Sequence, residues 1–399
     1  MQYDKIDHLG LVPSLADARK HMPVFAESIF SGKHHARYIE PDTPYHVITR
    51  TFQGRCLLTP TRKLNEIIAG VIGRAQLLCP HVRLYAYAFL SNHAHLLMQG
   101  PPDEVVDFIA FVKREISRRH GRNIDWREAM WGQYVCAALP SAASQISCFK
   151  YILSQGVKEG LVRRPEEWPG VHVAKQFVGR NPKPLTGTWF NGTDAAIAKA
   201  HLKFIEKRRE ARKEAKAAKL AKKKSQKQKK AHKQKHEPKL DLTQFKTTHT
   251  VRVEPLPPWA ELSAAYYRTQ VVQLCKEVTK EAHEARKGAP VLGVQGIMET
   301  PIDQSFNLEL PAWLEGRNSL LCWTAVDNGE TEKYIERYWS HQRAFREASD
   351  AYLAGQLDIR FPPLAFRPVL SEVRLMRARM AAIAQQAQVT REAVASVPS

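Results

Sequence analysis

The sequence predicts an α+β fold in which helices pack on an antiparallel sheet, followed by a basic linker and a mostly helical C-terminal region. Short runs of β-branched and aromatic residues alternate with longer amphipathic segments, in the order strand, helix, strands, helix, strand, helix. A chain of 399 residues with 44% hydrophobic residues can bury at least one full core, and its length predicts two or three domains.

The first predicted strand covers residues 45–51 (YHVITRT), which are rich in β-branched and aromatic side chains, and Gly54 offers a turn after it. The next segment has apolar residues at three- and four-residue spacing, which predicts a helix packed on one face of a sheet. These residues are Leu64, Ile67, Ile68, Val71, Ile72 and Ala75. Residues 83–90 (RLYAYAFL) are apolar on both faces, as in a central strand, and Ser91-Asn92 can turn the chain before HAHLLM continues it.

A second amphipathic helix is predicted after this pair of strands. Its buried stripe consists of Val105, Phe108, Ile109, Val112 and Ile116. Farther along the chain, residues 261–286 and 332–354 also have helical periodicity, and residues 361–368 (FPPLAFRP) predict a rigid turn before another helix. The C-terminal region fits a DNA-sequence reader, an oligomerisation unit or a scaffold equally well.

Positive charge is concentrated in one segment. Residues 201–240 hold 17 Lys and Arg against 4 Asp and Glu, which accounts for most of the net charge of +20. This segment has no apolar stripe, so we expect a solvated helix or a disordered tether. The predicted domains are therefore an N-terminal extension (1–37), an α+β domain (38–180), a linker with the basic tract (181–240) and the helical C-terminal region (241–399).

The composition also limits the class of protein. An excess of positive charge favours a polyanionic partner, with nucleic acid first and an acidic membrane surface second. The six cysteines are scattered without a Cys-x-x-Cys pair, which argues against a disulfide framework or a structural zinc and fits a reducing cytoplasm. We expect neither a signal peptide nor a membrane span, since no run of about 18 apolar residues occurs.

The sharpest motif is the pair His93 and His95. On a strand, side chains two residues apart share a face, so both imidazoles point the same way while Ala94, Leu96 and Met98 face the core. Two neutral imidazoles at this spacing form half of a metal site, and a third ligand must come from elsewhere in the fold. A His-x-His pair also occurs by chance, so the pair alone leaves both interpretations open.

A second segment raises the case for a metal site. If residues 142–155 are helical and capped near Gly156, Tyr151 and Gln155 lie one turn apart on the same face. A phenol and an amide can then approach one metal ion. Without the histidines, Tyr151 is better interpreted as a packed aromatic residue and Gln155 as a surface residue.

Together these segments resemble the HUH single-tyrosine transposases of bacterial insertion sequences, in particular the REP-associated tyrosine transposases. Four landmarks occur in the family's order within about residues 38–178. Residues 45–50 (YHVITR) resemble the opening strand, 87–98 (YAFLSNHAHLLM) the HUH strand, 128–139 (EAMWGQYVCAAL) the Trp-containing hairpin, and 151–170 (YILSQGVKEGLVRRPEEWPG) the tyrosine helix with its Pro/Trp-rich exit. The resemblance implies a ferredoxin-like or RRM-like antiparallel sheet with helices on one face, the HUH nuclease fold.

The resemblance also implies the site. Tyr151 is the nucleophile, and His93, His95 and Gln155 hold a divalent metal, Mg²⁺ or Mn²⁺, of which Mn²⁺ suits mixed nitrogen and oxygen ligands somewhat better. The sequence departs from the family at Ala94, where a bulky apolar residue is usual. It departs again at Gln155-Gly156, where many REP-associated members have Asn-Pro, although Gln matches the metal ligand of the wider single-tyrosine group.

The implied function is DNA transposition: metal-dependent cleavage of a single strand and strand transfer through a 5′-phosphotyrosine. The expected partner is single-stranded DNA with hairpin-containing ends, bound by a monomer or homodimer in the bacterial cytoplasm at the nucleoid. Candidate DNA-binding residues, each of which could equally be an ordinary solvated cation, are Arg50, Arg55, Lys113, Arg114, Arg118 and Arg119. The Lys-rich tract either binds DNA without sequence specificity or only separates the domains.

Two alternatives remain from the sequence. One is a catalytically inactive DNA- or RNA-binding protein on the same fold, although every expected catalytic residue is present. The other is a replication-initiator or relaxase-like nickase, which usually orders its tyrosine and histidine motifs differently, whereas here the histidines come first. His46, on the first strand, is open between a DNA contact and a packed histidine.

Overall fold

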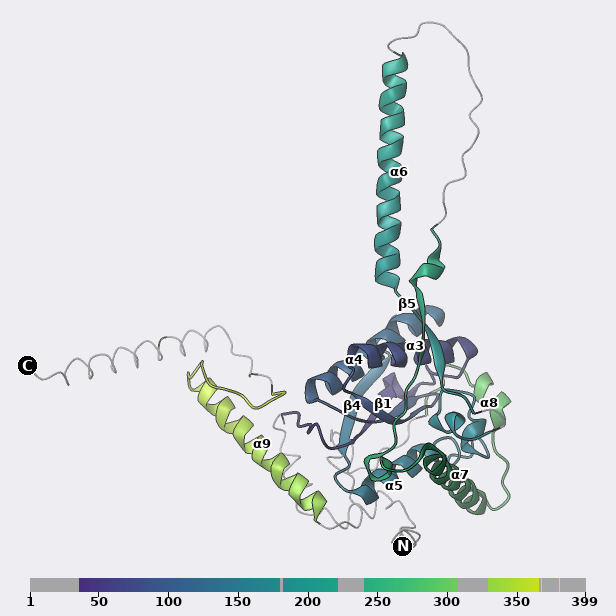
Figure 1. Ribbon diagram of the computed structural model, residues 1–399, viewed down its shortest axis with the longest axis vertical. Coiled ribbons are helices and arrows are strands. Elements are labelled where there is room, and N and C mark those ends of the chain that lie inside the picture. The colour runs from purple at the N-terminus through teal and green to yellow at the C-terminus, as the bar shows by residue number, and fades with distance from the viewer. Residues whose placement is uncertain are drawn as a thin grey trace, which may run out of the picture.

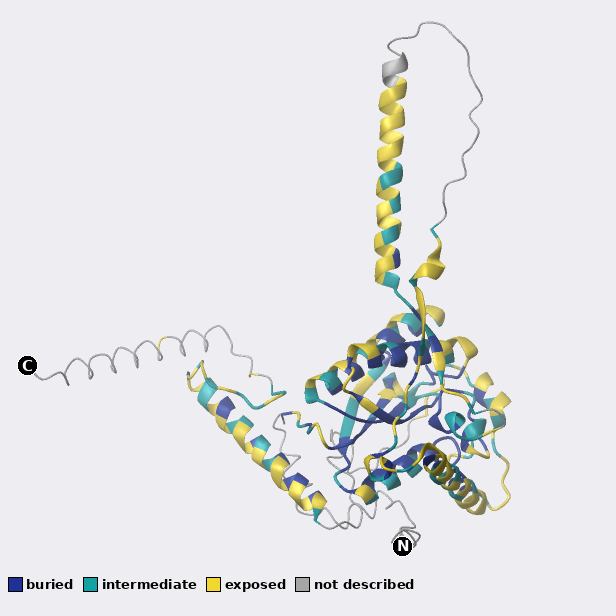
Figure 2. Ribbon diagram, in the orientation of Figure 1, coloured by how far each residue is buried: buried dark blue, intermediate teal, exposed yellow. Residues whose placement is uncertain are grey.

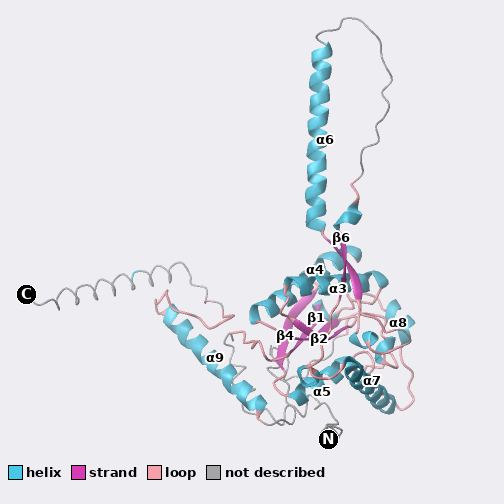
Figure 3. Cartoon of the chain, in the orientation of Figure 1, coloured by secondary structure: helices cyan, strands magenta, loops and turns pink. Residues whose placement is uncertain are grey.

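The computed structural model describes residues 36–179, 182–221, 240–306 and 329–365, together with residues 367 and 380. Figure 1 shows a central sheet with helices on both sides, and one long helix, labelled α6, projects away from this body. Figure 3 shows the helices and the strands in different colours. The described strands are β1 (Tyr45–Thr51), β2 (Arg83–Phe89), β3 (His93–Gln99), β4 (Trp131–Ala138), β5 (Thr186–Phe190) and β6 (Lys246–Thr250). The described α-helices are α3 (Arg62–Leu78), α4 (Pro102–Asn123), α5 (Ala142–Leu153), α6 (Gly192–Ala221), α7 (Ala264–Arg286), α8 (Gly293–Glu299) and α9 (Glu330–Leu353).

Strands β1 to β4 form one sheet in the order β2-β3-β1-β4, and every neighbouring pair is antiparallel. The α+β fold class and the antiparallel sheet predicted from the sequence are therefore confirmed. The segment 128–139 differs from the expectation of a hairpin. Its residues Trp131–Ala138 run along β1 as a single edge strand without reversing direction.

The sheet has helices on both faces. Val47 on β1 and Leu96 on β3 share a small apolar cavity with Ile109 and Val112 of α4, and α3 packs beside α4 in the same layer. Helix α5 lies on the opposite face, where it brings Tyr151 to the histidines. The expectation of helices on one face thus holds for α3 and α4, while α5 covers the other face. Figure 2 shows the buried residues concentrated on the sheet and on the helix sides turned toward it.

The hairpin of β5 and β6 packs on the outer side of α3. Gly70 makes this approach possible, because a Cβ at this position would lie only 2.4 Å from the carbonyl oxygen of Thr188. Helix α6 lies between the two paired strands in sequence, so the basic tract is an insertion in one hairpin, whereas we predicted a linker between two parts of the chain. The described length of α6 is largely exposed (Figure 2), and residues 222–239 lie outside the described residues.

The C-terminal helices pack around α5 and the segment before β1. Lys150 on α5 pairs with Glu281 of α7 at 2.7 Å and with Glu277 at 3.1 Å. The side chain of Arg337 on α9 pairs with Glu40 at 2.6 Å. The amphipathic helices predicted for residues 261–286 and 332–354 are confirmed as α7 and α9.

Two predicted features cannot be compared with the structure. The helix expected after residues 361–368 and most of the N-terminal extension, residues 1–35, lie outside the described residues. Within the described ranges, no helix combines the length and hydropathy needed to cross a membrane.

Candidate active site

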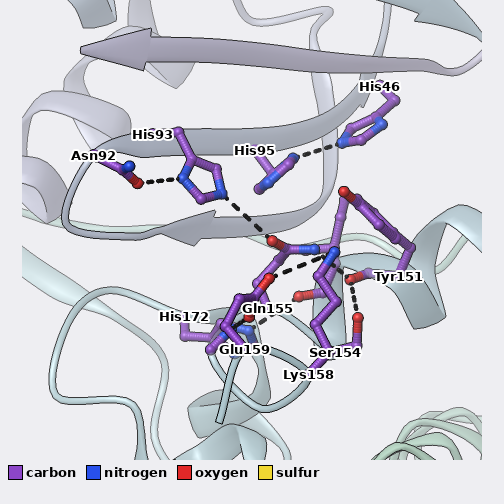
Figure 4. Close-up of polar contacts among 12 residues, drawn as sticks. His46, Asn92, His93, His95, Tyr151, Ser154, Gln155, Lys158, Glu159 and His172 are labelled. Atoms are coloured by element: carbon purple, nitrogen blue, oxygen red, sulfur yellow. Dashed lines mark hydrogen bonds and ion pairs between the residues drawn. The ribbon is translucent and has the colours of Figure 1, made fainter. Parts of the chain in front are cut away.

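Three histidines share one face of the sheet. In the register of β1 and β3, Ile48 lies opposite His95 and Arg50 lies opposite His93, and directly opposed residues point to the same face. His46 is two residues from Ile48 on β1 and therefore points to this face as well. The centroid of the His95 ring lies 4.8 Å from the centroid of the His93 ring and 5.1 Å from that of the His46 ring. The pair predicted from alternation is thus present, and His46 joins it (Figure 4).

Helix α5 and the turn after it bring Tyr151 and Gln155 to these histidines. The helix starts with a capping box between Ser141 and Ser144 and ends at Leu153, just before the predicted end. The Tyr151 ring lies 5.7 Å from the His95 ring and 5.9 Å from the His46 ring, between centroids. Helix α5 and its C-terminal turn therefore bring Tyr151 and Gln155 to the face of the sheet that carries the three histidines.

Gln155 is buried, and one hydrogen bond fixes the orientation of its amide. Its Nε2 donates to the Tyr151 carbonyl oxygen at 3.0 Å, which turns its Oε1 toward His93, 3.4 Å from the Nε2 atom of that ring. Gly156 follows with φ +82°, a left-handed conformation that ends the helical turn. A Cβ on Gly156 would lie 3.0 Å from the ring of Trp168, so this position also needs glycine for space.

Trp168 fixes this turn to the sheet. It is fully buried, and its Nε1 donates to the carbonyl oxygen of Phe89 on β2 at 2.9 Å. His172 adds a second connection. Its Nε2 lies 3.2 Å from the carbonyl oxygen of Ile152, and its backbone forms an antiparallel β-bridge with Ala88. The Pro/Trp-rich segment therefore sets the position of α5 relative to the histidine-bearing strand.

The hydrogen bonds of His93 identify its free nitrogen. Its Nδ1 lies 2.7 Å from Asn92 Oδ1 and its Nε2 lies 3.4 Å from Gln155 Oε1, and both oxygens are acceptors. A neutral ring has one N–H, and the shorter contact assigns it to Nδ1, which donates to Asn92. The Nε2 lone pair then faces Gln155 Oε1, which is also an acceptor. Two lone pairs that face each other repel unless a cation or a proton lies between them, and both atoms are therefore suited to bind a common metal ion.

His95 also has a ring nitrogen that is free to bind a metal ion. His46 Nε2 and His95 Nδ1 are 2.9 Å apart, so one of them carries the proton of this hydrogen bond. The other ring nitrogen of His95, Nε2, is buried and has no hydrogen-bond partner among the described residues. When His95 Nδ1 donates to His46, the lone pair of His95 Nε2 is left free, as metal ligation requires.

Burial keeps all three imidazoles neutral. It lowers the pKa of His46 to about 3 and of His93 to about 4, and the positive charge of Lys158 contributes to both shifts. Burial also holds the pKa of His95 well below its usual value, with smaller effects from His93, His46 and Lys158. Neutral rings keep their lone pairs at physiological pH, and this is the protonation state that binds metal ions.

The site offers three metal donors only if the side-chain amide of Gln155 is counted with the two histidines. Within the described parts of the chain, no group of three or more His, Cys, Asp or Glu side chains is placed to hold a metal ion. His93 Nε2, His95 Nε2 and Gln155 Oε1 supply two nitrogens and one oxygen from neutral groups. Such a set suits Mn²⁺ or Mg²⁺ with further ligands from water or substrate.

The predicted DNA-binding cations occupy different parts of the molecule. Arg50 is exposed opposite His93, and its charge contributes to the lowered pKa of that ring. Arg55 lies beyond the end of β1, 5.5 Å above the ring of Trp126. The α4 residues Lys113, Arg114, Arg118 and Arg119 belong to the layer on the other face of the sheet. Only Arg50 of these six residues is opposite a predicted metal ligand.

The α4 cations also have structural partners. Lys113 donates to the carbonyl oxygen of Gly132 at 2.8 Å. The three arginines surround one buried carboxylate, Glu115, at 3.6 Å for Arg114, 2.8 Å for Arg118 and 3.2 Å for Arg119. These contacts give the four cations partners within the chain, while the side chains of Arg114 and Arg118 stay 63% and 41% exposed.

Sequence reasoning missed two neighbours of the site. Asn92 was interpreted only as a turn residue, and it accepts the hydrogen bond that orients His93. Lys158 was not singled out, and its Nζ lies 3.7 Å from the centroid of the Tyr151 ring. The spacing of Tyr151, Gln155 and Lys158, four and then three residues, was the available signal, because it places side chains on one side of a helical turn.

No protein-family model matches the sequence, and no curated protein matches it. Among solved structures, the chain is similar to a REP-associated tyrosine transposase bound to a REP hairpin, with 17% identity over 38% of this chain and 89% of that chain, and a TM-score of 0.32. It is also similar to a predicted transposase from Deinococcus radiodurans R1, with 19% identity over 31% of this chain and 97% of that chain, and a TM-score of 0.22. Similarities of this size leave the assignment of function to the site itself.

Proposed function

We propose that the protein is a transposase that cleaves and rejoins single-stranded DNA through a covalent bond to Tyr151. The observation that carries the proposal is the convergence of three neutral lone pairs, from His93, His95 and Gln155, beside a tyrosine ring. A packed core has no use for facing acceptors or for a buried imidazole nitrogen without a partner. A metal-assisted phosphoryl-transfer site needs both.

In the proposed step, the phenol oxygen of Tyr151 bonds to phosphorus, and the bond from phosphorus to the 3′ oxygen of the preceding nucleotide breaks. The phenol loses its proton and the departing 3′ oxygen gains one, so a 5′-phosphotyrosine and a free 3′-hydroxyl result. The phosphoester is conserved in the protein–DNA bond. A second 3′-hydroxyl can therefore attack the same phosphorus and release Tyr151, which completes strand transfer without an external energy source.

The residues around Tyr151 have three further roles in the proposed reaction: metal binding, orientation of the imidazoles and binding of the DNA backbone. A divalent metal held by His93, His95 and Gln155 would polarise the phosphate and stabilise the charge that builds up on its oxygens. His46 and Asn92 hold the two imidazoles in the tautomers that leave Nε2 free. Arg50, exposed opposite His93, is placed to bind the DNA backbone next to the cleavage point.

The proposed substrate is a single strand with hairpin-containing ends, as the resemblance of residues 45–50, 87–98 and 151–170 to REP-associated tyrosine transposases implies. The site includes one tyrosine and one set of metal donors, which suits one strand at a time. An inactive nucleic-acid-binding protein on the same fold would bind such DNA without forming a covalent product.

The deciding experiment incubates the purified protein with end-labelled single-stranded DNA from the sequences next to its gene that can fold into hairpins, with Mn²⁺ or Mg²⁺. We expect a metal-dependent covalent adduct that resists denaturing electrophoresis and is lost in Tyr151→Phe. Removing the phenol oxygen removes the only atom that bonds to phosphorus, so the loss should exceed about 10⁴-fold, while the ring and its packing remain.

Tyr45→Phe is the matched control, because Tyr45 is buried on the α4 side of β1 and hydrogen-bonds to Tyr334 away from the histidines. It should leave adduct formation intact. DNA binding without an adduct under any metal would instead support the inactive binding protein. An adduct that persists in Tyr151→Phe would assign the nucleophile elsewhere.

A further inference from the structure

Lys158 places a positive charge directly beside the proposed nucleophile. Its Nζ lies 3.7 Å from the centroid of the Tyr151 ring, and Figure 4 shows its side chain beside Gln155 and Tyr151. The charge also contributes to the lowered pKa of His46, His93 and His95, after burial. One ammonium group therefore acts on the nucleophile and on every imidazole of the site.

The local chain geometry fixes this position. The chain continues to turn after α5, with the amides of Val157 and Lys158 both donating to the Ser154 carbonyl oxygen at 3.0 Å. Gly156 changes the chain direction through its positive φ. Lys158 consequently follows Gln155 on the side of the turn that faces Tyr151.

The protein offsets the charge of Lys158 only weakly. Glu159 Oε1 lies 3.5 Å from its Nζ, and the two side chains are 37% and 36% exposed, a setting in which an ion pair contributes little. The other carboxylate oxygen of Glu159 accepts a hydrogen bond from the Gly156 amide at 2.6 Å. This bond directs the carboxylate toward its own turn.

The predicted metal ligands bring no negative charge either. Two imidazoles and an amide are neutral, and the described residues contain no acidic cluster that could complete the site. A divalent ion bound here would have no carboxylate among these three ligands, and the carboxylate next to Lys158, that of Glu159, is directed toward its own turn. Like charges in a partly buried site repel, so the site needs an anion from its ligand.

We propose that Lys158 binds a non-bridging oxygen of the scissile phosphate and thereby makes metal binding and DNA binding mutually dependent. The proposal rests on the proposed function and names Lys158 as a further catalytic residue for it. Without DNA, Lys158 repels the metal ion. With DNA, the phosphate attracts both cations, and by thermodynamic linkage each ligand raises the affinity for the other by the same factor.

The test measures Mn²⁺ binding by electron paramagnetic resonance in full-length Tyr151→Phe protein, which cannot cleave DNA, with and without a hairpin-containing single strand. We expect DNA to raise the Mn²⁺ affinity by about tenfold or more. Adding Lys158→Gln should raise the affinity without DNA and reduce the coupling to about threefold or less. Lys158→Arg should keep the coupling, since it retains the charge. Lys63→Gln is the control, because Lys63 is an exposed lysine of α3 on the far face of the sheet.

A second arm separates a phosphate contact from ring packing. In the protein with Tyr151 intact, Lys158→Gln should slow adduct formation by about 100-fold on normal DNA. On DNA with a neutral methylphosphonate at the cleavage point, the same substitution should have almost no further effect. Equal losses on both substrates, or unchanged coupling in Lys158→Gln, would overturn the proposal for Lys158 while leaving the transposase function standing. Failure of the intact protein to form any adduct would instead reject the proposed function.

Discussion

At the scale of single residues, His46 decides which nitrogen of His95 is available. His46 is completely buried and its pKa is lowered to about 3, so it stays neutral and can accept the proton of His95 Nδ1. A hydrogen-bond partner of this kind fixes both the tautomer and the orientation of a metal-binding imidazole. The sequence left His46 open between a DNA contact and a packed residue, and the structure gives it a histidine partner.

His46→Phe should weaken Mn²⁺ binding by about 10- to 100-fold in DNA-bound Tyr151→Phe protein, because the tautomer of His95 is no longer fixed. His46→Gln should lose less, since its amide oxygen can still accept from His95 Nδ1. Calorimetric titration at neutral pH measures both. His120→Gln is the matched control, because His120 on α4 is also buried and its Nε2 lies 2.8 Å from the Leu57 carbonyl oxygen, outside the candidate site. Equal losses in the control would mean that the effect arises from general loosening of the fold.

At the scale of elements, His172 joins three parts of the fold. It bridges to Ala88 on β2, accepts from the Ala174 amide at 3.2 Å, and lies 3.2 Å from the Ile152 carbonyl oxygen on α5. These bonds use a neutral ring, with Nε2 donating and Nδ1 accepting. Burial lowers the pKa of His172 to about 4, so acid should weaken the attachment of α5 to the sheet.

The sign of this pH dependence follows from proton linkage. In the unfolded chain His172 takes up a proton at pH about 6.5, and in the folded protein only at about 4, so acidification within this window favours unfolding. In urea unfolding, the free energy of unfolding of wild type minus that of His172→Gln should fall by about 3 kcal/mol as the pH falls from 7 to 4. The other buried histidines titrate in both proteins and cancel in the difference. Parallel stability curves for the two proteins would rule out this role.

Strand alternation and helical periodicity were sufficient to predict β1, β2, β3, α3 and α4, because the helices bury one face on the sheet and β2 and β3 are buried on both faces. The same alternation correctly placed His93 and His95 on one face. It could not predict the pairing of β5 with β6, since these strands are far apart in sequence and β6 is largely exposed. Nor could it place Lys158, whose position depends on the turn at Gly156 and on the burial of Trp168.

At the scale of the whole molecule, helix α6 with the basic tract, here called the basic arm, and the candidate active site lie on opposite sides of the sheet. Helix α6 leaves from the hairpin that packs on α3, whereas α5, which brings Tyr151 to the histidines, lies on the other face (Figure 1). Between Lys199 and Lys219 the helix has nine Lys and Arg against three Glu. A charge that is separated from the chemistry can raise affinity for DNA without changing the cleavage step.

Replacing residues 196–239 with a short Gly/Ser segment should therefore weaken DNA binding and flatten its salt dependence, while adduct formation at saturating DNA and low salt continues. The hairpin should survive, because Asn191 still donates to the Phe245 carbonyl oxygen at 2.8 Å across the excised arm. Each lost phosphate contact lowers the slope of log affinity against log salt by about 0.7 for a single strand. Fluorescence anisotropy between about 50 and 200 mM salt measures this slope.

Changing Glu206, Glu210 and Glu214 to Gln makes the opposite change in charge on the same helix and should steepen the salt dependence of DNA binding. An arm that only spaces other parts of the protein would leave the slope unchanged in both variants, because counterion release depends on the charges that meet phosphate and not on the length of the chain that carries them.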